Sequence, residues 1–358
     1  GKRADHGEFM KLRDKQVENF RPAVVIAEIG ANHNGDMELA RKMVTAAKEA
    51  GADYAKFQSW TKESIFARVV YDENYFLGDD YRDRDDYTLE QIVDEFSLSH
   101  AQLAEMKEYC DEVGIGFSST PFSKSEADFL VDELDADFIK VASMDCNNYP
   151  FLEHLGRKKR PVILSTGLSA LWEIAKAVDV LEAAGAPSVA ILHCISIYPP
   201  PDDIVNLRNI DMLRETFERP VGFSDHSLGT LVPIAALARG ACIIEKHFTL
   251  DKEMFGWDHK VSASVQELAD ITEAARRVPT LCGTRRRVVS SLDLEKRPAF
   301  RRSVVAARPI EAGKVIEHDD LDVKRPARGV PPGELHTIVG RVAKRDIPFD
   351  KLLDDEDY

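Results

Sequence analysis

The chain has 358 residues, of which 44% are hydrophobic and 30% charged, and it carries a formal net charge of −15. These values are ordinary for a soluble globular protein, and every apolar run is shorter than the ~20 residues that a membrane span needs. The negative charge argues against nucleic acid or an anionic membrane as a partner, because a phosphate backbone requires a basic face.

Residues 1–21 are charged and contain no apolar stretch that could act as a signal peptide, so we expect a cytoplasmic protein. The cysteines are odd in number and lack paired spacing, and three of them lie in apolar runs. We interpret them as reduced core residues rather than as disulfides or thiolate metal ligands. They are Cys110, Cys146, Cys194, Cys242 and Cys282.

From residue 24 onward, short apolar runs alternate with amphipathic segments, which is typical of βα units around a parallel sheet. The runs are rich in Val, Ile and Phe, as buried parallel strands are. Helices are predicted at 37–50, 170–184 and 230–239, and Ser99 and Gln102 have the spacing of a capping box. The predicted strands are 24–30, 52–57, 116–119, 138–141, 162–165, 189–193, 221–224 and 242–247.

Eight strand–helix pairs within ~250 residues favour a closed (β/α)8 barrel over residues 1–283. An open doubly wound sheet is the alternative, but residues 30–35 (GANHNG) lack its G-x-G-x-x-G fingerprint. Residues 59–98 are too long for an ordinary connection, and we interpret them as an elaborated loop above the barrel. Within it, residues 79–86 could bind a cation, although their mixed charges favour a solvated loop.

The alternating pattern stops near residue 284. Residues 284–298 are basic and then polar, which predicts a linker. Short strand-like runs at 303–306, 313–316 and 321–324, with a turn at 329–333, predict a second domain over 299–358. A domain of ~60 residues is only marginally stable alone, so we expect it to dock on a barrel.

In a (β/α)8 barrel, the residues at the C-terminal ends of the strands form the active site. In this chain those positions are polar. In strand order they are Glu28, Asn32 and His33; Lys56 and Gln58; Lys140, Ser143 and Asp145; Ser165, Thr166 and Gly167; His193, Ser196 and Tyr198; Ser224, Asp225 and His226; and Glu245, Lys246 and His247.

Two lysines at these ends indicate an anion pocket. Lys56 and Lys140 can form charge-assisted bonds with a phosphate and a carboxylate, the two anionic groups of a small phosphorylated acid. A single strand-end lysine could equally well pair with a nearby acid. The combination with Ser143, Ser165 and Ser224 favours the pocket.

Two histidines follow adjacent predicted strands. His226 and His247 could therefore meet at one point, which suits a divalent metal with open positions for substrate and water. The alternative is a pair of hydrogen-bonded structural histidines. The sequence has neither an H-E-x-x-H motif nor paired thiolates, which disfavours a zinc protease or a structural zinc site.

Eight ordered motifs resemble those of the sialic acid (nonulosonic acid) synthase family, and residues 301–340 are similar to its antifreeze-like (SAF) domain. The resemblance implies a (β/α)8 TIM barrel followed by a small SAF domain, and it covers nearly the whole chain. The motifs are residues 27–35 (AEIGANHNG), 56–58 (KFQ), 117–122 (FSSTPF), 139–143 (IKVAS), 164–167 (LSTG), 192–194 (LHC) with 198–199 (YP), 222–227 (GFSDHS) and 245–249 (EKHFT).

The resemblance also implies a metal-dependent transferase. The enol carbon of phosphoenolpyruvate would attack the aldehyde of N-acetylmannosamine or a related 2-acetamido hexose, water would add at the enol-ether carbon, and phosphate would leave. His226 and His247 would hold Mn²⁺ or Mg²⁺. The phosphoenolpyruvate side would be formed by Lys56, Lys140, Ser143, Ser165, Ser196, Tyr198 and Ser224.

For acid–base chemistry the resemblance leaves Glu28, the leading candidate, and Asp145. Asp258 and Arg302 would contact the sugar, Arg302 from the partner subunit of a domain-swapped homodimer. Three positions depart from the family pattern: Met144-Asp145 replaces Gly-Glu, Ser196 replaces Asn, and Trp257 puts a bulky aromatic before Asp258.

These departures leave the acceptor sugar open. One alternative is a phosphoenolpyruvate-dependent synthase of another sugar acid, of the legionaminic, pseudaminic or deaminated type. Another is a non-catalytic protein that binds carbohydrate or ice. The C-terminal domain favours a nine-carbon product, because the related synthases of seven- and eight-carbon acids usually lack it.

Overall fold

The computed structural model describes residues 10–74 and 87–358. The chain divides into two compact units, residues 1–283 and 284–358. Residues 79–86, the segment of mixed charge, lie outside the described residues, as do residues 1–9. Within the described part, no helix combines the length and the apolar content needed to cross a membrane.

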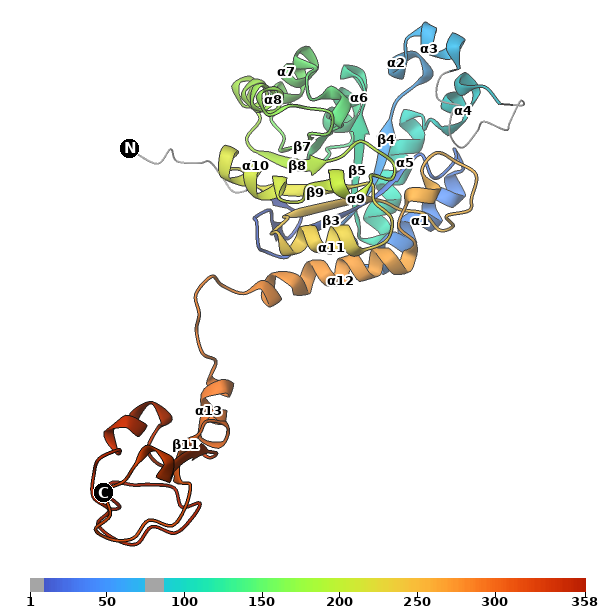
Figure 1. Ribbon diagram of the computed structural model, residues 1–358. Coiled ribbons are helices and arrows are strands. Elements are labelled where there is room, and N and C mark those ends of the chain that lie inside the picture. Colours follow the sequence, from blue (N-terminus) through green and yellow to red (C-terminus); the bar gives the residue numbers. More distant parts are fainter. Residues whose placement is uncertain (1–9, 75–86) are drawn as a thin grey trace. The chain divides into compact units, whose positions relative to one another are not determined.

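The described residues of the larger unit contain eight parallel strands, and all eight predicted strands are confirmed. In spatial order the sheet runs β5-β4-β3-β10-β9-β8-β7-β6, and β5 also contacts β6, so the ring closes as in a TIM barrel (Figure 1). The strands are β3 (Val24–Gly30), β4 (Tyr54–Ser59), β5 (Gly116–Pro121), β6 (Ile139–Val141), β7 (Val162–Ser165), β8 (Val189–Cys194), β9 (Val221–Asp225) and β10 (Ile243–His247).

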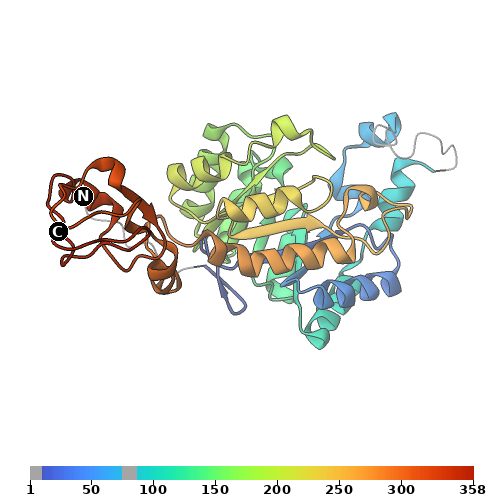
Figure 2. The same ribbon diagram turned by 60° about the horizontal axis from the view of Figure 1, so that its bottom comes forward.

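Helices surround these strands (Figures 1 and 2). The predicted capping box at the start of α5 is confirmed: the Ser99 hydroxyl accepts a bond from Gln102 N at 3.3 Å, and Gln102 Oε1 accepts one from Ser99 N at 2.9 Å. The helices are α1 (Met37–Glu49), α5 (His100–Val113), α6 (Lys124–Asp128) continued by the π-helix η2 (Phe129–Glu133), α7 (Tyr149–Arg157), α8 (Leu171–Ala184), α9 (Asp202–Val205), α10 (Asn209–Phe217), α11 (Leu231–Ala238) and α12 (Val265–Cys282).

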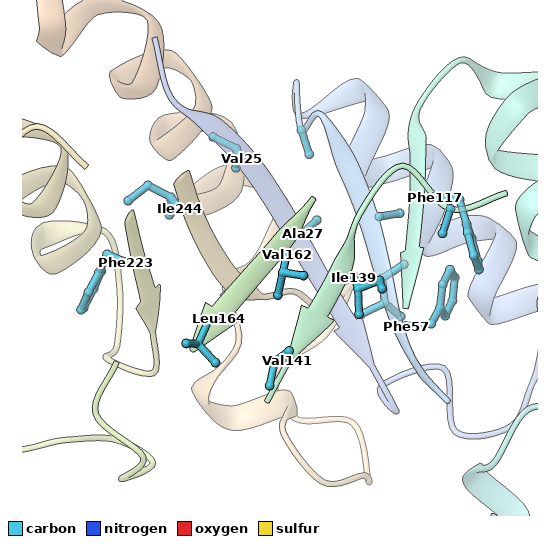
Figure 3. Close-up of a cluster of buried hydrophobic side chains, with 14 of the residues drawn as sticks. Val25, Ala27, Phe57, Phe117, Ile139, Val141, Val162, Leu164, Phe223 and Ile244 are labelled. Carbon is cyan, nitrogen blue, oxygen red and sulfur yellow. The ribbon is translucent and has the colours of Figure 1, made fainter. Parts of the chain in front are cut away.

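Side chains alternate between the two faces of each strand. One face packs against the helices and includes Val25, Ala27, Phe57, Phe117 and Ile244 (Figure 3). The other face fills the N-terminal part of the barrel with a second apolar cluster. Its members are Val24, Ile26, Tyr54, Phe138, Ile163, Ala190, Leu192, Cys242 and Ile243, together with Met10, Leu12 and Val17.

Met10, Leu12 and Val17 belong to a short hairpin, β1 (Lys11–Leu12) and β2 (Lys15–Gln16), that precedes the barrel. We call this second cluster the apolar floor. Two residues beyond it along their strands lie Glu28, Lys56 and Lys140, which therefore point into the barrel above the floor.

The prediction of a loop over residues 59–98 is wrong for the part that the structure describes. This part contains α2 (Lys62–Ile65), α3 (Arg68–Glu73) and α4 (Leu89–Phe96). Thr88 and Gln91 form a capping box at the start of α4, and the buried residues Leu89, Ile92, Val93 and Phe96 have helical spacing. They pack with Trp60 and Ala31 in a separate cluster. The sequence carries this helical signal despite the length of the connection.

The smaller unit begins with a segment that is partly helical where a linker was expected. Helix α13 (Ser291–Phe300) starts at Ser290, whose hydroxyl accepts a bond from Asp293 N at 3.0 Å. None of the residues of α13 is buried within the unit. The capping serine and the helix-forming residues after it account for this local helix.

The rest of the smaller unit is built from short strands and turns. Strand β11 (Ser303–Ala306) pairs antiparallel with β12 (Leu321–Lys324), and isolated bridges join Ile310 to Ile347 and Val315 to Val342. The 3₁₀ helices η5 (His318–Asp320) and η6 (Pro332–Thr337) connect them. A core of Val304, Ala306, Ile316, Ile338 and Leu353 holds the unit together.

Candidate active site

Four buried charged side chains meet above the apolar floor: Glu28, Lys56, Lys140 and Glu245, here called the charged cluster. The Lys56 ammonium forms an ion pair with Glu28 and lies 3.7 Å from Glu245 Oε2. The Lys140 ammonium lies 3.7 Å from Glu245 Oε1. Carboxylates and ammonium groups thus alternate, which offsets part of the cost of burying four charges.

Hydroxyl groups surround the two ammonium groups. Lys56 Nζ donates to Thr120 Oγ1 at 2.6 Å, and Lys140 Nζ donates to Ser165 Oγ at 2.8 Å. Ser224 Oγ donates to Glu245 Oε1 at 2.9 Å. The structure therefore brings together four residues of the expected anion pocket, namely Lys56, Lys140, Ser165 and Ser224.

The other two serines of that pocket lie beside Gly167. Gly167 N donates to Ser143 Oγ at 3.0 Å, and a β-carbon at position 167 would collide with the hydroxyls of both Ser143 and Ser196. Ser143 begins the 3₁₀ helix η3 (Ser143–Asp145) directly after β6. Glycine at position 167 thus makes room for two hydroxyls at the mouth of the barrel.

The two carboxyl groups of the charged cluster differ in pKa. Burial raises the pKa of Glu28 to about 7, although the charge of Lys56 opposes this rise. Burial also favours the neutral form of Glu245, but the charges of Lys140 and Lys56 outweigh it and lower the pKa of Glu245 to about 2. Glu245 is therefore ionised at neutral pH, whereas Glu28 can both give and take a proton.

Two imidazole rings lie next to the charged cluster, with 5.7 Å between the ring centroids of His226 and His247. His226 Nδ1 lies 2.7 Å from Ile195 O. Because a carbonyl only accepts, Nδ1 carries the proton and Nε2 keeps a free lone pair, as in many metal-bound histidines. The Tyr198 ring lies 3.9 Å from the His226 ring.

His247 presents a nitrogen that the fold leaves unsatisfied. Its Nδ1 is buried without a hydrogen-bond partner in the described part of the chain, 3.8 Å from Asp258 Oδ2. Burial lowers the pKa of His247 well below its usual value, so the ring is neutral, the form that binds metals. Both histidines can thus offer a lone pair.

The described residues contain no group of three or more His, Cys, Asp or Glu side chains arranged to hold a metal ion. A divalent ion held by His226 and His247 would therefore take its other ligands from substrate and water. Such a site keeps the open positions that a catalytic metal needs, and the two imidazoles fit it. Burial lowers the pKa of His226, but Cys194 and the Ile195 carbonyl outweigh it and raise the pKa above its usual value, so a metal ion would have to displace a proton from this ring.

The remaining expected residues are spread more widely. Asp145 is partly buried, accepts a bond from Asn148 Nδ2 at 3.0 Å, and has its pKa raised by burial. Asp258 lies beside His247. Arg302 belongs to the smaller unit, where its guanidinium donates to Val323 O at 3.1 Å.

The loop that carries Asp258 is fixed by its neighbours. The Trp257 ring packs against Trp60 and Phe96, with centroid separations of 5.6 and 6.0 Å. Asn34 Nδ2 donates to Phe255 O at 2.7 Å. The aromatic ring that departs from the family pattern thus anchors this loop to α4 and to the end of β4.

Sequence reasoning named Glu245 as a strand-end residue but gave it no role, although its carboxylate lies 3.7 Å from both lysines. The signal was present, because Ile243, Glu245 and His247 alternate along one strand and must point the same way. Gln58 was named only as a strand-end residue, and its Nε2 donates to Glu28 Oε1 at 3.2 Å.

Comparison with known proteins gives concordant matches over both units. Residues 43–287 match the NeuB family, and residues 301–358 match the SAF domain. The N,N'-diacetyllegionaminic acid synthase of Legionella pneumophila is 37% identical over 320 residues, covering 88% of this chain and 89% of that protein. Human N-acetylneuraminate-9-phosphate synthase is 33% identical over 340 residues, covering 93% of both.

A solved structure of similar fold agrees with these sequence matches. The N-acetylneuraminic acid (sialic acid) synthetase of Leptospira borgpetersenii, crystallised with citrate, matches with a TM-score of 0.70 at 30% identity. The match covers 82% of this chain and 96% of that chain.

Proposed function

The chain belongs to the NeuB family, and on this premise we propose that it condenses phosphoenolpyruvate with N-acetylmannosamine or a related 2-acetamido hexose, giving a nine-carbon 2-keto acid and phosphate. The observation that carries this proposal is the charged cluster with its two buried ammonium groups, which lies next to a pair of imidazoles. This combination suits an anionic donor beside a carbonyl acceptor.

Phosphoenolpyruvate would occupy the space bounded by Lys56, Lys140, Ser165 and Ser224. The ammonium groups already lie in place, held by Glu28 and Glu245, so little reorganisation accompanies binding. Its phosphate and carboxylate oxygens would accept bonds from the lysines and hydroxyls. Ser143 and Ser196, beside Gly167, would extend this set toward the mouth.

Glu28 would move the protons. When the new C–C bond forms, the aldehyde oxygen must gain a proton, and the water that adds to the enol-ether carbon must lose one before phosphate departs. Because its pKa lies near 7, Glu28 can serve both steps at neutral pH. Asp145, whose pKa is also raised, is the second candidate.

His226 and His247 would hold Mn²⁺ or Mg²⁺, which when bound supplies Lewis-acid polarisation of the aldehyde oxygen. The bond from His226 Nδ1 to Ile195 O fixes the ring and leaves Nε2 as the nitrogen that would hold the ion. Asp258, beside His247, would orient the sugar.

The test is phosphate release from phosphoenolpyruvate across a panel of aldehydes: N-acetylmannosamine, a 2,4-diacetamido hexose and unsubstituted mannose. We expect release with the acetamido sugars, and the better one identifies a neuraminic or a legionaminic type of product. If only unsubstituted mannose supports release, the product is of the deaminated type. The absence of release with every aldehyde would favour the non-catalytic alternative.

The pH dependence of phosphoenolpyruvate binding tests the assignment of Glu28. Ionisation of Glu28 near pH 7 lowers the net charge of the charged cluster by one, so an anionic ligand binds more weakly above this pH. If bound phosphoenolpyruvate raises the Glu28 pKa by about one further pH unit, affinity falls about fivefold from pH 6 to pH 8. Titration calorimetry measures this change.

Glu28→Gln is the matched control, because it keeps the shape and removes the titration. The second ionisation of the phosphate, near pH 6, affects both proteins equally. We expect the Glu28→Gln affinity to lack the alkaline decrease. A variant that follows the wild-type profile would place the ionisation elsewhere.

We propose a homodimer in which Arg302 of one subunit completes the sugar site of its partner. Residues 284–298, if fully extended, would span roughly 50 Å. Because α13 is helical, the extended part is limited to residues 284–290, which reach about 25 Å, and α13 adds about 15 Å. The combined reach of the extended part and α13 is shorter than that of a fully extended segment, but it still exceeds the width of one layer of helices.

A complementation experiment tests this arrangement. His226→Ala chains and Arg302→Ala chains are each expected to be inactive, and mixing them under exchange conditions should restore activity, because one site of each heterodimer contains both wild-type residues. Phosphate release is the measurement. A mixture no more active than its components would show that each SAF unit serves its own barrel.

A further inference from the structure

A fully buried ion pair lies directly behind the two histidines. Lys246 Nζ lies 2.6 Å from Asp225 Oδ2, and both side chains are 0% exposed. The two residues face each other in register on β10 and β9. Removing two charges from water costs several kcal/mol per ion, and apolar residues of similar volume often serve stability as well. The pair therefore calls for an explanation other than stability.

The pair and the histidines lie on opposite faces of the same two strands. Phe223 and Ile244, two residues before Asp225 and Lys246, pack in the layer between strands and helices (Figure 3). Side-chain alternation places Asp225 and Lys246 on that same outer face. Helices α11 and α12 run side by side over it (Figures 1 and 2).

Hydrogen bonds of this pair fix the backbone on both sides of His226. Lys246 Nζ also donates to Ser227 O at 2.5 Å, and Asp225 Oδ1 accepts a bond from Ser227 N at 2.9 Å. Both chain neighbours of His226 are thus fixed. The same lysine immediately precedes His247, so a single side chain connects the backbone at both imidazoles.

We propose that Asp225 and Lys246 are positioning residues that set the separation and direction of the His226 and His247 rings, so that both can bind one divalent ion. This inference rests on the metal-binding part of the proposed function. Partners behind a metal ligand commonly change metal affinity by about 10–100-fold when they are mutated. The pair holds the backbone of the ligands rather than their rings.

The competing explanation is that the pair merely joins two strands. A double variant distinguishes this explanation from the positioning role. Asp225→Leu combined with Lys246→Met replaces the ion pair by apolar groups and leaves no single charge buried. The matched control is Asp53→Leu with Lys15→Met, a pair 2.8 Å apart at the start of β4, on the far side of the apolar floor.

The experiment titrates Mn²⁺ by calorimetry into chelator-treated full-length wild type and both double variants, with melting temperatures recorded in parallel. We expect the Asp225/Lys246 variant to remain folded and to bind Mn²⁺ at least about tenfold more weakly. The KM for phosphoenolpyruvate, set by the charged cluster, should change little while kcat falls. The control variant should bind Mn²⁺ as the wild type does.

Wild-type Mn²⁺ affinity in the folded Asp225/Lys246 variant would overturn the proposal. If that variant does not fold, the isosteric Asp225→Asn variant is tested instead. We expect it to keep a native near-ultraviolet spectrum and to bind Mn²⁺ more weakly. Unchanged Mn²⁺ binding in Asp225→Asn would count against the proposal. A wild-type chain that releases phosphate but binds no Mn²⁺ would overturn the positioning role and leave the condensation intact. If the Asp225/Lys246 variant binds Mn²⁺ more weakly but the wild type releases no phosphate, the positioning role stands and the proposed condensation is overturned.

Discussion

Replacing either His226 or His247 with alanine is expected to lower turnover by about three orders of magnitude, the equivalent of ~4 kcal/mol of transition-state stabilisation. The described residues offer no third histidine, cysteine or carboxylate arranged to take over the metal, so the loss of one imidazole halves the protein's ligands. Phosphate release at saturating substrates measures the effect, and circular dichroism checks the fold.

His193→Gln is the matched control for these variants. His193 is also a buried strand-end histidine, but its Nε2 bonds to Val205 O at 2.7 Å, away from the rings of His226 and His247. We expect this variant to keep most of its turnover. Full activity in EDTA-treated enzyme without added Mn²⁺ or Mg²⁺ would contradict the metal assignment directly.

Lys140→Ala is expected to raise the KM for phosphoenolpyruvate strongly and to change the KM for the sugar much less. Removing one partner of a desolvated charge pair commonly costs ~2–5 kcal/mol, which corresponds to about 30-fold or more in affinity. The ammonium of Lys140 lies 3.7 Å from Glu245 and bonds to Ser165, so its loss also leaves the Glu245 carboxylate with fewer partners. Initial rates with each substrate varied in turn measure the two constants.

Lys15→Ala is the control for a general effect of losing a paired lysine. Lys15 bonds to Asp53 at 2.8 Å, below the apolar floor rather than above it. We expect both KM values of this variant to stay near those of the wild type. Equal increases of both constants in Lys140→Ala would mean that Lys140 does not belong to the phosphate pocket.

The barrel was predictable because a buried parallel strand leaves a local signal. Most of the strands are short runs rich in Val, Ile or Leu, and β3 and β7 occupy the same residue ranges, 24–30 and 162–165, that the pattern indicates. The expected residues also follow from position, since Glu28, Lys56 and Lys140 each lie two residues beyond a floor residue along the chain, on the face that points into the barrel. Local pattern and barrel geometry together determine them.

The parts that escaped prediction depend on which strands meet across the barrel. Glu245 on β10 approaches Lys140 on β6, although these strands are not neighbours in the sheet. The alternation along β10 indicates that Glu245 points into the barrel, but nothing in the local sequence indicates which lysine it meets. Cys194 is free and buried as expected, but its contact with His226 Nδ1 at 4.0 Å could not be predicted from the local sequence. Cys282 was also expected in the core and is exposed.

Helix α4 escaped for a different reason. Its capping box and apolar spacing are as clear as those of α5, but the length of the connection between β4 and β5 favoured a loop. The length of a connection limits only the distance between the two strands that it joins, whereas hydrophobic periodicity indicates the secondary structure within it. For residues 89–96 the periodicity was the better guide.

The apolar floor closes the barrel at one end, so that the interior is open only at the C-terminal ends of the strands. The hairpin residues Met10, Leu12 and Val17 seal the N-terminal end, and the charged cluster lies directly above them. Tyr198 and Asp258, which are more exposed, lie nearer the opening. A ligand that binds at the charged cluster must therefore enter before a second ligand occupies the mouth, and it can leave only after the mouth is vacated. For the proposed reaction we therefore expect an ordered addition, in which phosphoenolpyruvate binds before the sugar.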